Sequence, residues 1–313
     1  MSELKSTYAM SISGRMTLEM HSLNNEGGEG NQITTRMVAL VDPDGAVHKV
    51  NAISGDMFKH IQAEHLYLRA KGNLPLCVGC QVFSASRVLD DEEFMGSLAD
   101  RDGDVIDALL EKCAIDDMEG NLIARGARSI PRKSVAEFGW VVGLPEKTRT
   151  ESYFHVRYAA ERGGDERVEQ PIFHRPASSG VYAAVASFEL ARIGFNDITQ
   201  TYPLEEDKRL ARYKAFMESV LYTFVEPNGA MRNTQNPHIV AFEGVVTVSH
   251  EVMPAPTLSP LSDGYREEIA GIAEALSRDR NGALAVYPFD TMSQFAGILQ
   301  DIITSTRPYR LFA

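Results

Sequence analysis

Hydrophobic and polar residues alternate near the start of the chain. From Tyr8 to Met20 every even position is apolar or glycine, whereas the odd positions include serine, arginine, threonine and glutamate. A period of two is typical of a strand with one buried face and one polar face. The next segment, 24–31, is polar and rich in glycine, and we interpret it as an exposed loop.

The pattern then predicts a β-hairpin followed by a helix. The segments 36–41 and 46–53 flank Asp42-Pro43-Asp44-Gly45, whose proline and glycine favour a tight turn. Ser54 is a suitable N-cap for a helix over about 55–69, because apolar residues recur on one side of that segment.

Longer periodic segments predict the elements of the second half. The spacing in 205–224 is helical, with apolar residues three and four positions apart. The other predicted strands are 135–142, 153–158, 180–190, 238–249 and 282–287, and the other predicted helices are 105–113, 263–277 and 289–304. Strands and helices mix without strict βαβ alternation, which favours an α+β sheet domain with insertions over a doubly wound fold.

Composition and charge limit the partners. The 313 residues are 44% hydrophobic and 24% charged, which is typical of a globular chain with a sizeable core. The net charge is −12, so a polyanion has to meet a local basic surface. No apolar run is long enough to span a bilayer and the N-terminus lacks the features of a signal peptide, so we expect a cytoplasmic protein without membrane contact.

The three cysteines are too few for a disulfide framework, so we expect reduced thiols. Cys77-x-x-Cys80 has the spacing of half a zinc site, which Cys113 and a histidine such as His65 would complete. A single pair of this kind also fits ordinary thiols. The sequence favours the second interpretation, and we expect no metal and no cofactor.

One segment of this acidic chain is basic. The stretch 125–133 carries four basic residues and no acidic one: Arg125, Arg128, Arg132 and Lys133. Such segregation is suited to a phosphate backbone, and a solvated loop with chance charges is the alternative.

The start of the first predicted helix is a second candidate anion site. Ser54-Gly55 would present free backbone N–H groups and the positive helix end, with Lys59 and His60 one turn further along. A helix that is merely capped is the alternative. Arg15 and Arg36, on the first two predicted strands, would line one surface with both basic sites.

The order of these segments resembles a known family. The matching residues are Gly14-Arg15, Gly30-Asn31, Arg36, Val50 to His60, Leu74-Pro75, Lys112 to Gly120, Arg132-Lys133-Ser134, Ser178 to Ala183 and Pro237-His238. Together they resemble the backbone subunit of type I CRISPR surveillance complexes (Cascade), the DevR-like branch of the RAMP superfamily. The resemblance covers most of 1–250.

The resemblance implies one RRM-like (ferredoxin-like) palm domain over 1–313, with a fingers insertion at 71–125 and a hairpin thumb at 144–178. Members of this family form a homo-oligomeric filament along crRNA and join other Cascade subunits. We therefore expect a non-catalytic, RNA-binding subunit of a ribonucleoprotein that presents crRNA for pairing with target DNA in antiviral defence.

The resemblance also implies which residues bind RNA. Four of them would hold phosphates, others would approach or follow the RNA backbone, and aromatic residues of the thumb would stack on bases or wedge between them. The complete set is Arg15, Asn31, Arg36, Ser54, Gly55, Lys59, His60, Arg125, Arg128, Arg132, Lys133, Phe154, Phe173 and His174.

Two features bear on catalysis. Relatives in type III complexes that cleave target RNA use an Asp after the first strand, whereas the segment between Leu23 and Thr35 contains only Glu26 and Glu29 as acidic residues. We therefore expect no cleavage by this chain. A metal-dependent nuclease that uses the acidic cluster at 90–104 is the alternative hypothesis.

Overall fold

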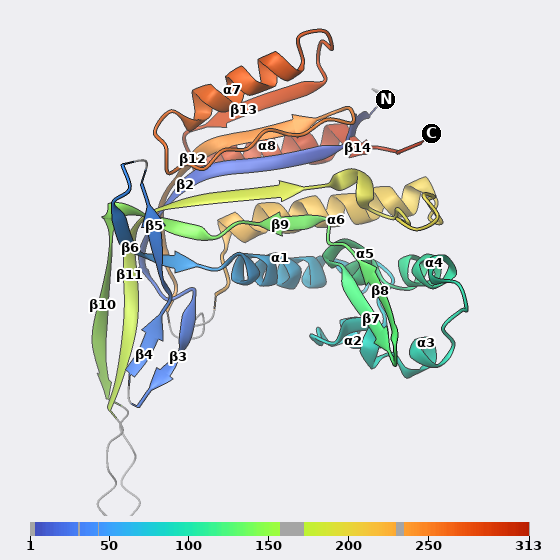
Figure 1. Cartoon of the computed structure of the whole chain (residues 1–313), viewed down its shortest axis with the longest axis horizontal. Coiled ribbons are helices and arrows are strands. Elements are labelled where there is room, and N and C mark those ends of the chain that lie inside the picture. Colours follow the sequence, from blue (N-terminus) through green and yellow to red (C-terminus); the bar gives the residue numbers. More distant parts are fainter. Residues whose placement is uncertain (1–3, 31, 43, 157–171, 230–234, 313) are drawn as a thin grey trace, which may run out of the picture.

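The computed structural model describes residues 4–30, 32–42, 44–156, 172–229 and 235–312. Its centre is a ten-stranded sheet whose main path runs β13-β12-β2-β11-β10-β6-β5 (Figure 1), with every pairing on this path antiparallel. The strands of this path are β13 (Leu284–Phe289), β12 (His238–Ser249), β2 (Ala9–His21), β11 (Ile172–Phe188), β10 (Val141–Val156), β6 (Val47–Ile53) and β5 (Met37–Val41). The fold is thus a mixture of helices with a large antiparallel sheet.

Helices cover both faces of the sheet. One face carries α1 (Gly55–Ala70), α6 (Glu206–Val225) and α8 (Met292–Ser305). Met10, Ile12, Met16 and Leu18 of β2 belong to the main core beneath them, whereas Met20 near the end of the strand is exposed. The opposite face carries α7 (Tyr265–Leu276), because Tyr265 packs with Val245 of β12, whereas the next residue, Val246, belongs to the main core.

Two parts of the chain extend from the sheet on the side of α1 (Figure 1). The arm is the outer part of the β10–β11 hairpin, residues 144–156 and 172–180, with β3 (Asn25–Glu29) and β4 (Gln32–Thr35) beside it. The lobe is 78–132, with α2 (Val78–Gln81), η1 (Arg87–Asp90), α3 (Glu92–Gly96), α4 (Asp102–Lys112), α5 (Ala114–Glu119), β7 (Asn121–Arg125) and β8 (Arg128–Arg132). Figure 1 shows α1 between the arm and the lobe.

Short elements complete the chain. They are β1 (Lys5–Thr7), which pairs with β14 (Thr306–Pro308), β9 (Ala136–Phe138), which pairs with β11, and η2 (Leu190–Arg192). Among the described residues, none of the helices combines the length and apolar character that crossing a bilayer requires.

Most predicted elements are confirmed, and two interpretations are wrong. The segment 135–142, predicted as one strand, is divided between β9 and the start of β10. The strands β5, β6 and β12 and the helices α1 and α6 lie within a residue or so of their predicted bounds. The segment 24–31, interpreted as a loop, instead contains β3 and the turn to β4, with Gly28 paired to Ile33. The strand β4 also pairs with β11 at His174, which is a distant backbone partner that local composition does not reveal.

Candidate nucleic-acid interface

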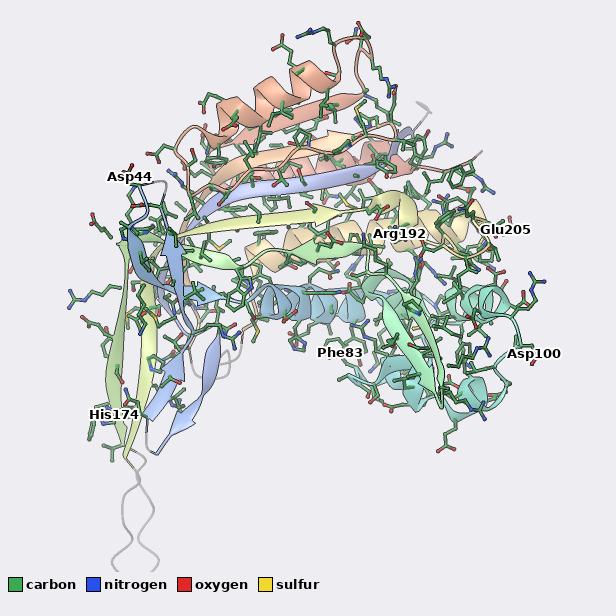
Figure 2. All side chains as sticks on the ribbon, viewed as in Figure 1. Asp44, Phe83, Asp100, His174, Arg192 and Glu205 are labelled. Atoms are coloured by element: carbon green, nitrogen blue, oxygen red, sulfur yellow. The ribbon has the colours of Figure 1, made fainter. Side chains whose placement is uncertain are left out.

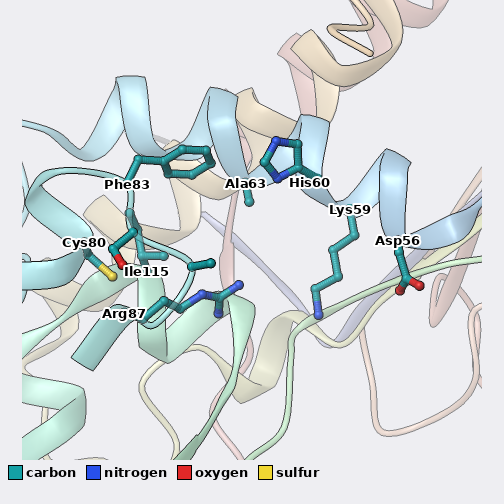
Figure 3. Close-up of a pocket in the computed structure, with 10 residues that line it drawn as sticks. Asp56, Lys59, His60, Ala63, Cys80, Phe83, Arg87 and Ile115 are labelled. Carbon is teal, nitrogen blue, oxygen red and sulfur yellow. The ribbon is translucent and has the colours of Figure 1, made fainter. Parts of the chain in front are cut away.

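A hollow of about 260 Å³ lies between α1 and the part of the lobe that follows α2 (Figure 3). Lys59 and His60 extend into it from α1, and Arg87 faces them from the lobe. Its lining consists of Asp56, Lys59, His60, Ala63, Cys80, Phe83, Ser84, Ala85, Arg87 and Ile115. The hollow therefore combines positive groups with an apolar wall.

Lys59 supplies the ammonium group of the hollow. Within the described part of the chain this side chain forms neither a hydrogen bond nor an ion pair. Burial lowers the pKa of Lys59 because the charged ammonium loses solvent, and the carboxylates of Glu119 and Asp56 counteract this effect. A phosphate oxygen entering the hollow would give the ammonium a direct partner.

Arg87 is the second cation of the hollow. Its Nη1 donates a hydrogen bond to the backbone carbonyl of Gly120, which fixes the guanidinium beside the hollow. An arginine carries further N–H groups in the same plane, and these suit the geometry of a phosphate.

The aromatic ring of Phe83 lines the hollow on the lobe side. The ring of Phe83 lies 5.6 Å from that of His60 and stacks on Tyr67 with centroids 5.0 Å apart. Figure 2 shows Phe83 on the lobe and His174 on the arm, both on the side of the sheet that carries α1. Rings beside cations are the combination that binds single-stranded nucleic acid without sequence preference.

Ser54 and Gly55 have structural roles at the start of α1. The Ser54 Oγ accepts a hydrogen bond from the Met57 N–H at 3.2 Å, and the Ser54 N–H donates to Asn24 Oδ1 at 2.9 Å. A Cβ on Gly55 would lie 2.2 Å from the carbonyl oxygen of Phe138, so only glycine allows α1 to approach β9 this closely. Capping and packing account for both residues.

Arg15 lies away from the hollow. Its Nε donates to the carbonyl of Pro260 at 2.8 Å and its Nη2 forms an ion pair with Asp263 at 2.7 Å. This is the sheet face opposite to α1, where the segment around Pro256 also covers Ser11. The expectation that Arg15 lines one surface with Lys59 is therefore wrong, because the polar face of the first strand is covered by a distant part of the chain.

Arg36 lies at the junction of β4 and β5. Its guanidinium is 5.2 Å from the ring centroid of Trp140, a half-exposed residue between β9 and β10. The backbone carbonyl of Arg36 accepts hydrogen bonds from the Ala52 N–H and from Asn51 Nδ2, both at 3.0 Å. The residue is thus held at the base of the arm.

The basic stretch 125–133 mostly stabilises the lobe. Arg125 donates to the carbonyl of Met95, and Arg128 donates to Asp102 and to the carbonyl of Ala99, both at 2.7 Å. These contacts tie the β7–β8 hairpin to the neighbouring helices.

The two remaining basic residues of this stretch have carboxylate partners. Arg132 is 3% exposed and pairs with the buried Asp117, so its predicted place along an RNA backbone is wrong. Lys133 is exposed and lies within ion-pair distance of Glu137 and Glu189, at 3.2 and 3.5 Å.

The arm carries an exposed aromatic pair. Phe154 is 60% exposed and lies directly opposite His174 in the β10–β11 ladder, with ring centroids 5.6 Å apart. Both side chains are available for stacking. The predicted roles of Asn31 and of the Phe173 side chain lie outside the described residues.

Phe83 and Arg87 were not among the binding residues predicted from the sequence. A signal was present, because the segment 71–89 contains no acidic residue in an otherwise acidic chain. The proximity of this segment to Lys59 was not evident, since it depends on how the lobe packs on α1.

The acidic cluster at 90–104 forms no metal site in the part of the chain that the structure describes. Asp91 caps α3 and pairs with Lys112 at 3.1 Å, and Asp102 pairs with Arg128. These carboxylates are distributed over separate contacts, so the geometry does not support the nuclease hypothesis.

Comparisons with known proteins show which solved structure this fold is similar to and which family the chain belongs to. The fold is similar to that of a solved chain of a CRISPR RNA-guided surveillance complex, pre-nicking, with a TM-score of 0.52 and 11% identity over 95% of this chain and 99% of the other. Residues 12–270 match the family described as CRISPR-associated negative auto-regulator DevR/Csa2, and the chain belongs to this family. A CRISPR-associated protein Cas7/Cst2/DevR from Methanocaldococcus jannaschii is 22% identical over 287 residues, which covers 84% of this chain and 86% of that protein. The family that the sequence resembles is thereby confirmed.

Proposed function

We propose that this chain is a crRNA-binding backbone subunit of a Cascade-type surveillance complex and that it holds RNA without cleaving it. The observation that carries the proposal is the hollow in which Lys59 and Arg87 face each other beside the ring of Phe83. The similarity to a chain of an RNA-guided surveillance complex supports it through the fold.

The chemistry of the hollow fits RNA of any sequence. Positive groups contact phosphates, which every nucleotide carries, and an aromatic ring stacks on any base. A backbone subunit needs this lack of preference, because sequence is read by pairing between the guide and its target. The net charge of −12 restricts binding to such local basic surfaces.

The proposal includes the organisation implied by the resemblance. The central sheet with α1 and α6 serves as an RRM-like palm, 71–125 as fingers and 144–178 as the thumb. In this scheme copies of the chain assemble along crRNA with other Cascade subunits, and the exposed Phe154 and His174 of the arm stack on bases. Target DNA is then reached through the guide.

An RNA titration tests the proposal. Two unrelated single-stranded RNAs of equal length are titrated with the full chain at several salt concentrations, with fluorescence anisotropy as the readout. Replacing Lys59 or Arg87 by alanine should lower the affinity for both RNAs about tenfold, which corresponds to the loss of one charged contact. Each variant should also reduce the slope of log K against log[salt] by about 0.7.

The matched control is Arg278→Ala. Arg278 is exposed near the end of α7, and no hydrogen bond or ion pair involves it within the described residues. It loses the same charge as Arg87→Ala. Affinities of Lys59→Ala and Arg87→Ala equal to that of this control would contradict the proposed interface, and an effect on only one RNA sequence would contradict backbone-directed binding.

A further inference from the structure

Three cysteines and one aspartate converge inside the lobe. Cys77 and Cys80 come from the start of α2, and Cys113 and Asp116 come from the start of α5. One ligand atom from each lies within 4.8 Å of the other three, and all four residues are buried. The cysteines are free thiols. Four potential ligands therefore surround one point in the interior.

The four residues form two half-sites of the same design. In Cys77-x-x-Cys80 and in Cys113-x-x-Asp116, the first residue is the N-cap of a short helix and the second is the third residue of that helix. Two-residue spacing is typical of zinc ligands at a tight turn. From the sequence, Cys113 was matched with His65 and not with Asp116, because the second half-site replaces one cysteine by aspartate.

The distances suit a tetrahedral zinc ion. Oδ2 of Asp116 lies 3.2 Å from Sγ of Cys77 and 3.6 Å from Sγ of Cys80. With Zn–S bonds of about 2.3 Å and Zn–O bonds of about 2.0–2.2 Å, a tetrahedron places sulfur and oxygen about 3.6 Å apart. The separation of 3.6 Å from Cys80 matches this value, and the separation of 3.2 Å from Cys77 is slightly shorter.

Neighbouring groups orient two of the ligands. Asn121 Nδ2 donates to Oδ1 of Asp116 at 2.7 Å, which leaves Oδ2 directed at the sulfur atoms. The backbone N–H of Asp116 donates to Sγ of Cys113 at 3.5 Å. Hydrogen bonds of this kind typically hold metal ligands in place.

A metal-free cluster explains these features less well. Within the described residues no lysine or arginine forms an ion pair with Asp116, although its carboxyl group is fully buried. A buried carboxylate requires a compensating charge. A redox role is disfavoured, because cysteines that react with other molecules are partly exposed, whereas these are at most 1% exposed.

We propose that Cys77, Cys80, Cys113 and Asp116 bind one structural zinc ion. The protein supplies all four ligands, so no coordination position is left for a substrate. His65, the fourth ligand suggested by the sequence, lies elsewhere, with its Nε2 2.9 Å from the carbonyl oxygen of Glu226.

The ion would join α2 to α5 inside the lobe. Cys80 also lines the hollow, and the chain continues from it directly to Phe83 and Arg87 (Figure 3). Ile115, between two of the ligands, lines the same hollow. Zinc would thus fix the lobe side of the hollow, and its binding is independent of what the hollow itself contains.

Metal analysis of the full chain tests the proposal. The protein is purified under reducing conditions from cells grown with added zinc, and its zinc content is measured by inductively coupled plasma mass spectrometry. We expect one zinc per chain. Replacement by cobalt(II) should give the intense sulfur-to-metal absorption and the strong visible bands of a tetrahedral thiolate site.

Two variants and one control locate the ion. Asn121→Ala removes only the orienting hydrogen bond and should weaken zinc binding about 10–100-fold, measured by competition with a chelating dye. Cys113→Ser should remove the ion or shift the cobalt bands. Asp100 is exposed and is not one of the four proposed zinc ligands, so Asp100→Asn should bind zinc as tightly as the wild type.

Chelation keeps the test valid if Cys113→Ser does not fold. Removing zinc from the wild-type protein should lower its melting temperature and expose three thiols to a thiol reagent, and added zinc should reverse both effects. The proposal would be overturned if the zinc-free protein bound no metal in excess zinc, or if Cys113→Ser gave the same cobalt spectrum as the wild type. A Cys77–Cys80 disulfide under reducing conditions would also overturn it.

Discussion

Arg132 and Asp117 form an ion pair in the interior, with Nη2 of Arg132 2.7 Å from Oδ1 of Asp117 and both side chains at most 1% exposed. Arg212 of α6 binds the other carboxylate oxygen of Asp117 at 2.8 Å. The backbone N–H of Gly194 donates to the same carboxylate. A residue from the most basic stretch of the chain therefore joins β8, α5 and α6.

Replacing Arg132 by alanine should reduce the free energy of unfolding by about 3–5 kcal/mol, because it leaves part of a buried charge network uncompensated. Urea unfolding followed by circular dichroism measures this. Arg278→Ala loses the same charge at an exposed position and should be neutral. A variant with wild-type stability and selectively weakened RNA binding would contradict the structural role of Arg132.

Stability should decrease in mild acid because of His21. Burial lowers the pKa of His21 to about 4, against 6.5 in the unfolded chain. Below pH 6.5 the unfolded state binds a proton that the folded state does not, so stability present above pH 6.5 is lost as the pH falls toward 4. The expected loss from this residue is about 3 kcal/mol.

His21→Gln isolates this contribution. The variant keeps a polar side chain at the contact with Tyr182 but does not titrate. In urea unfolding between pH 7 and 4, the free energy of unfolding should decrease less with falling pH for the variant than for the wild type. Parallel curves would show that His21 is not the group responsible, and the partly buried His250 would then be the next to test, since burial also lowers its pKa.

Gly55→Ala should destabilise the protein by about 1–3 kcal/mol, as overpacking usually does. The added Cβ would lie 2.2 Å from the Phe138 carbonyl oxygen and force α1 away from β9. Gly297→Ala in α8 is the matched control, because a Cβ there meets no atom within 4 Å and alanine favours a helix. If both variants unfolded at the same urea concentration, the close approach of α1 to β9 would be refuted.

Phe154→Ala should weaken RNA binding without a loss of stability. The ring is 60% exposed, so its removal changes little packing. Loss of one stacked base costs about 1–3 kcal/mol, which is roughly a 5- to 150-fold increase in Kd. Titration of RNA with the protein under conditions in which the complex assembles measures this Kd. The control is Phe312→Ala, because Phe312 is a 75% exposed phenylalanine near the C-terminus. Equal affinities of the two variants would exclude stacking by the arm.

Local patterns predicted the elements whose partners are close in sequence. The alternation in β2, the turn between β5 and β6 and the periodicity of α1 and α6 are each visible within about twenty residues. The hairpin of β3 and β4 was missed because part of its pairing comes from β11, far along the chain. Strand propensity depends on such context more than helix propensity does.

The candidate site was predictable to a smaller extent. Lys59 and His60, which the sequence placed at a candidate anion site near the start of α1, line the hollow, and their contact with RNA stays a prediction. Charge alone did not distinguish an exposed cation from Arg132, which has a carboxylate partner inside the protein. Asp116 was overlooked as a ligand because its role depends on the approach of α2 to α5.

The central claim is tested most directly by expressing the full chain with and without a repeat-spacer RNA and measuring mass and the 260/280 nm absorbance ratio across a size-exclusion profile. The account predicts a large, nucleic-acid-rich particle containing guide-length RNA, which is lost when Lys59 and Arg87 are both replaced by alanine and retained in Arg278→Ala. A folded monomer with a low absorbance ratio in both wild-type preparations would contradict it.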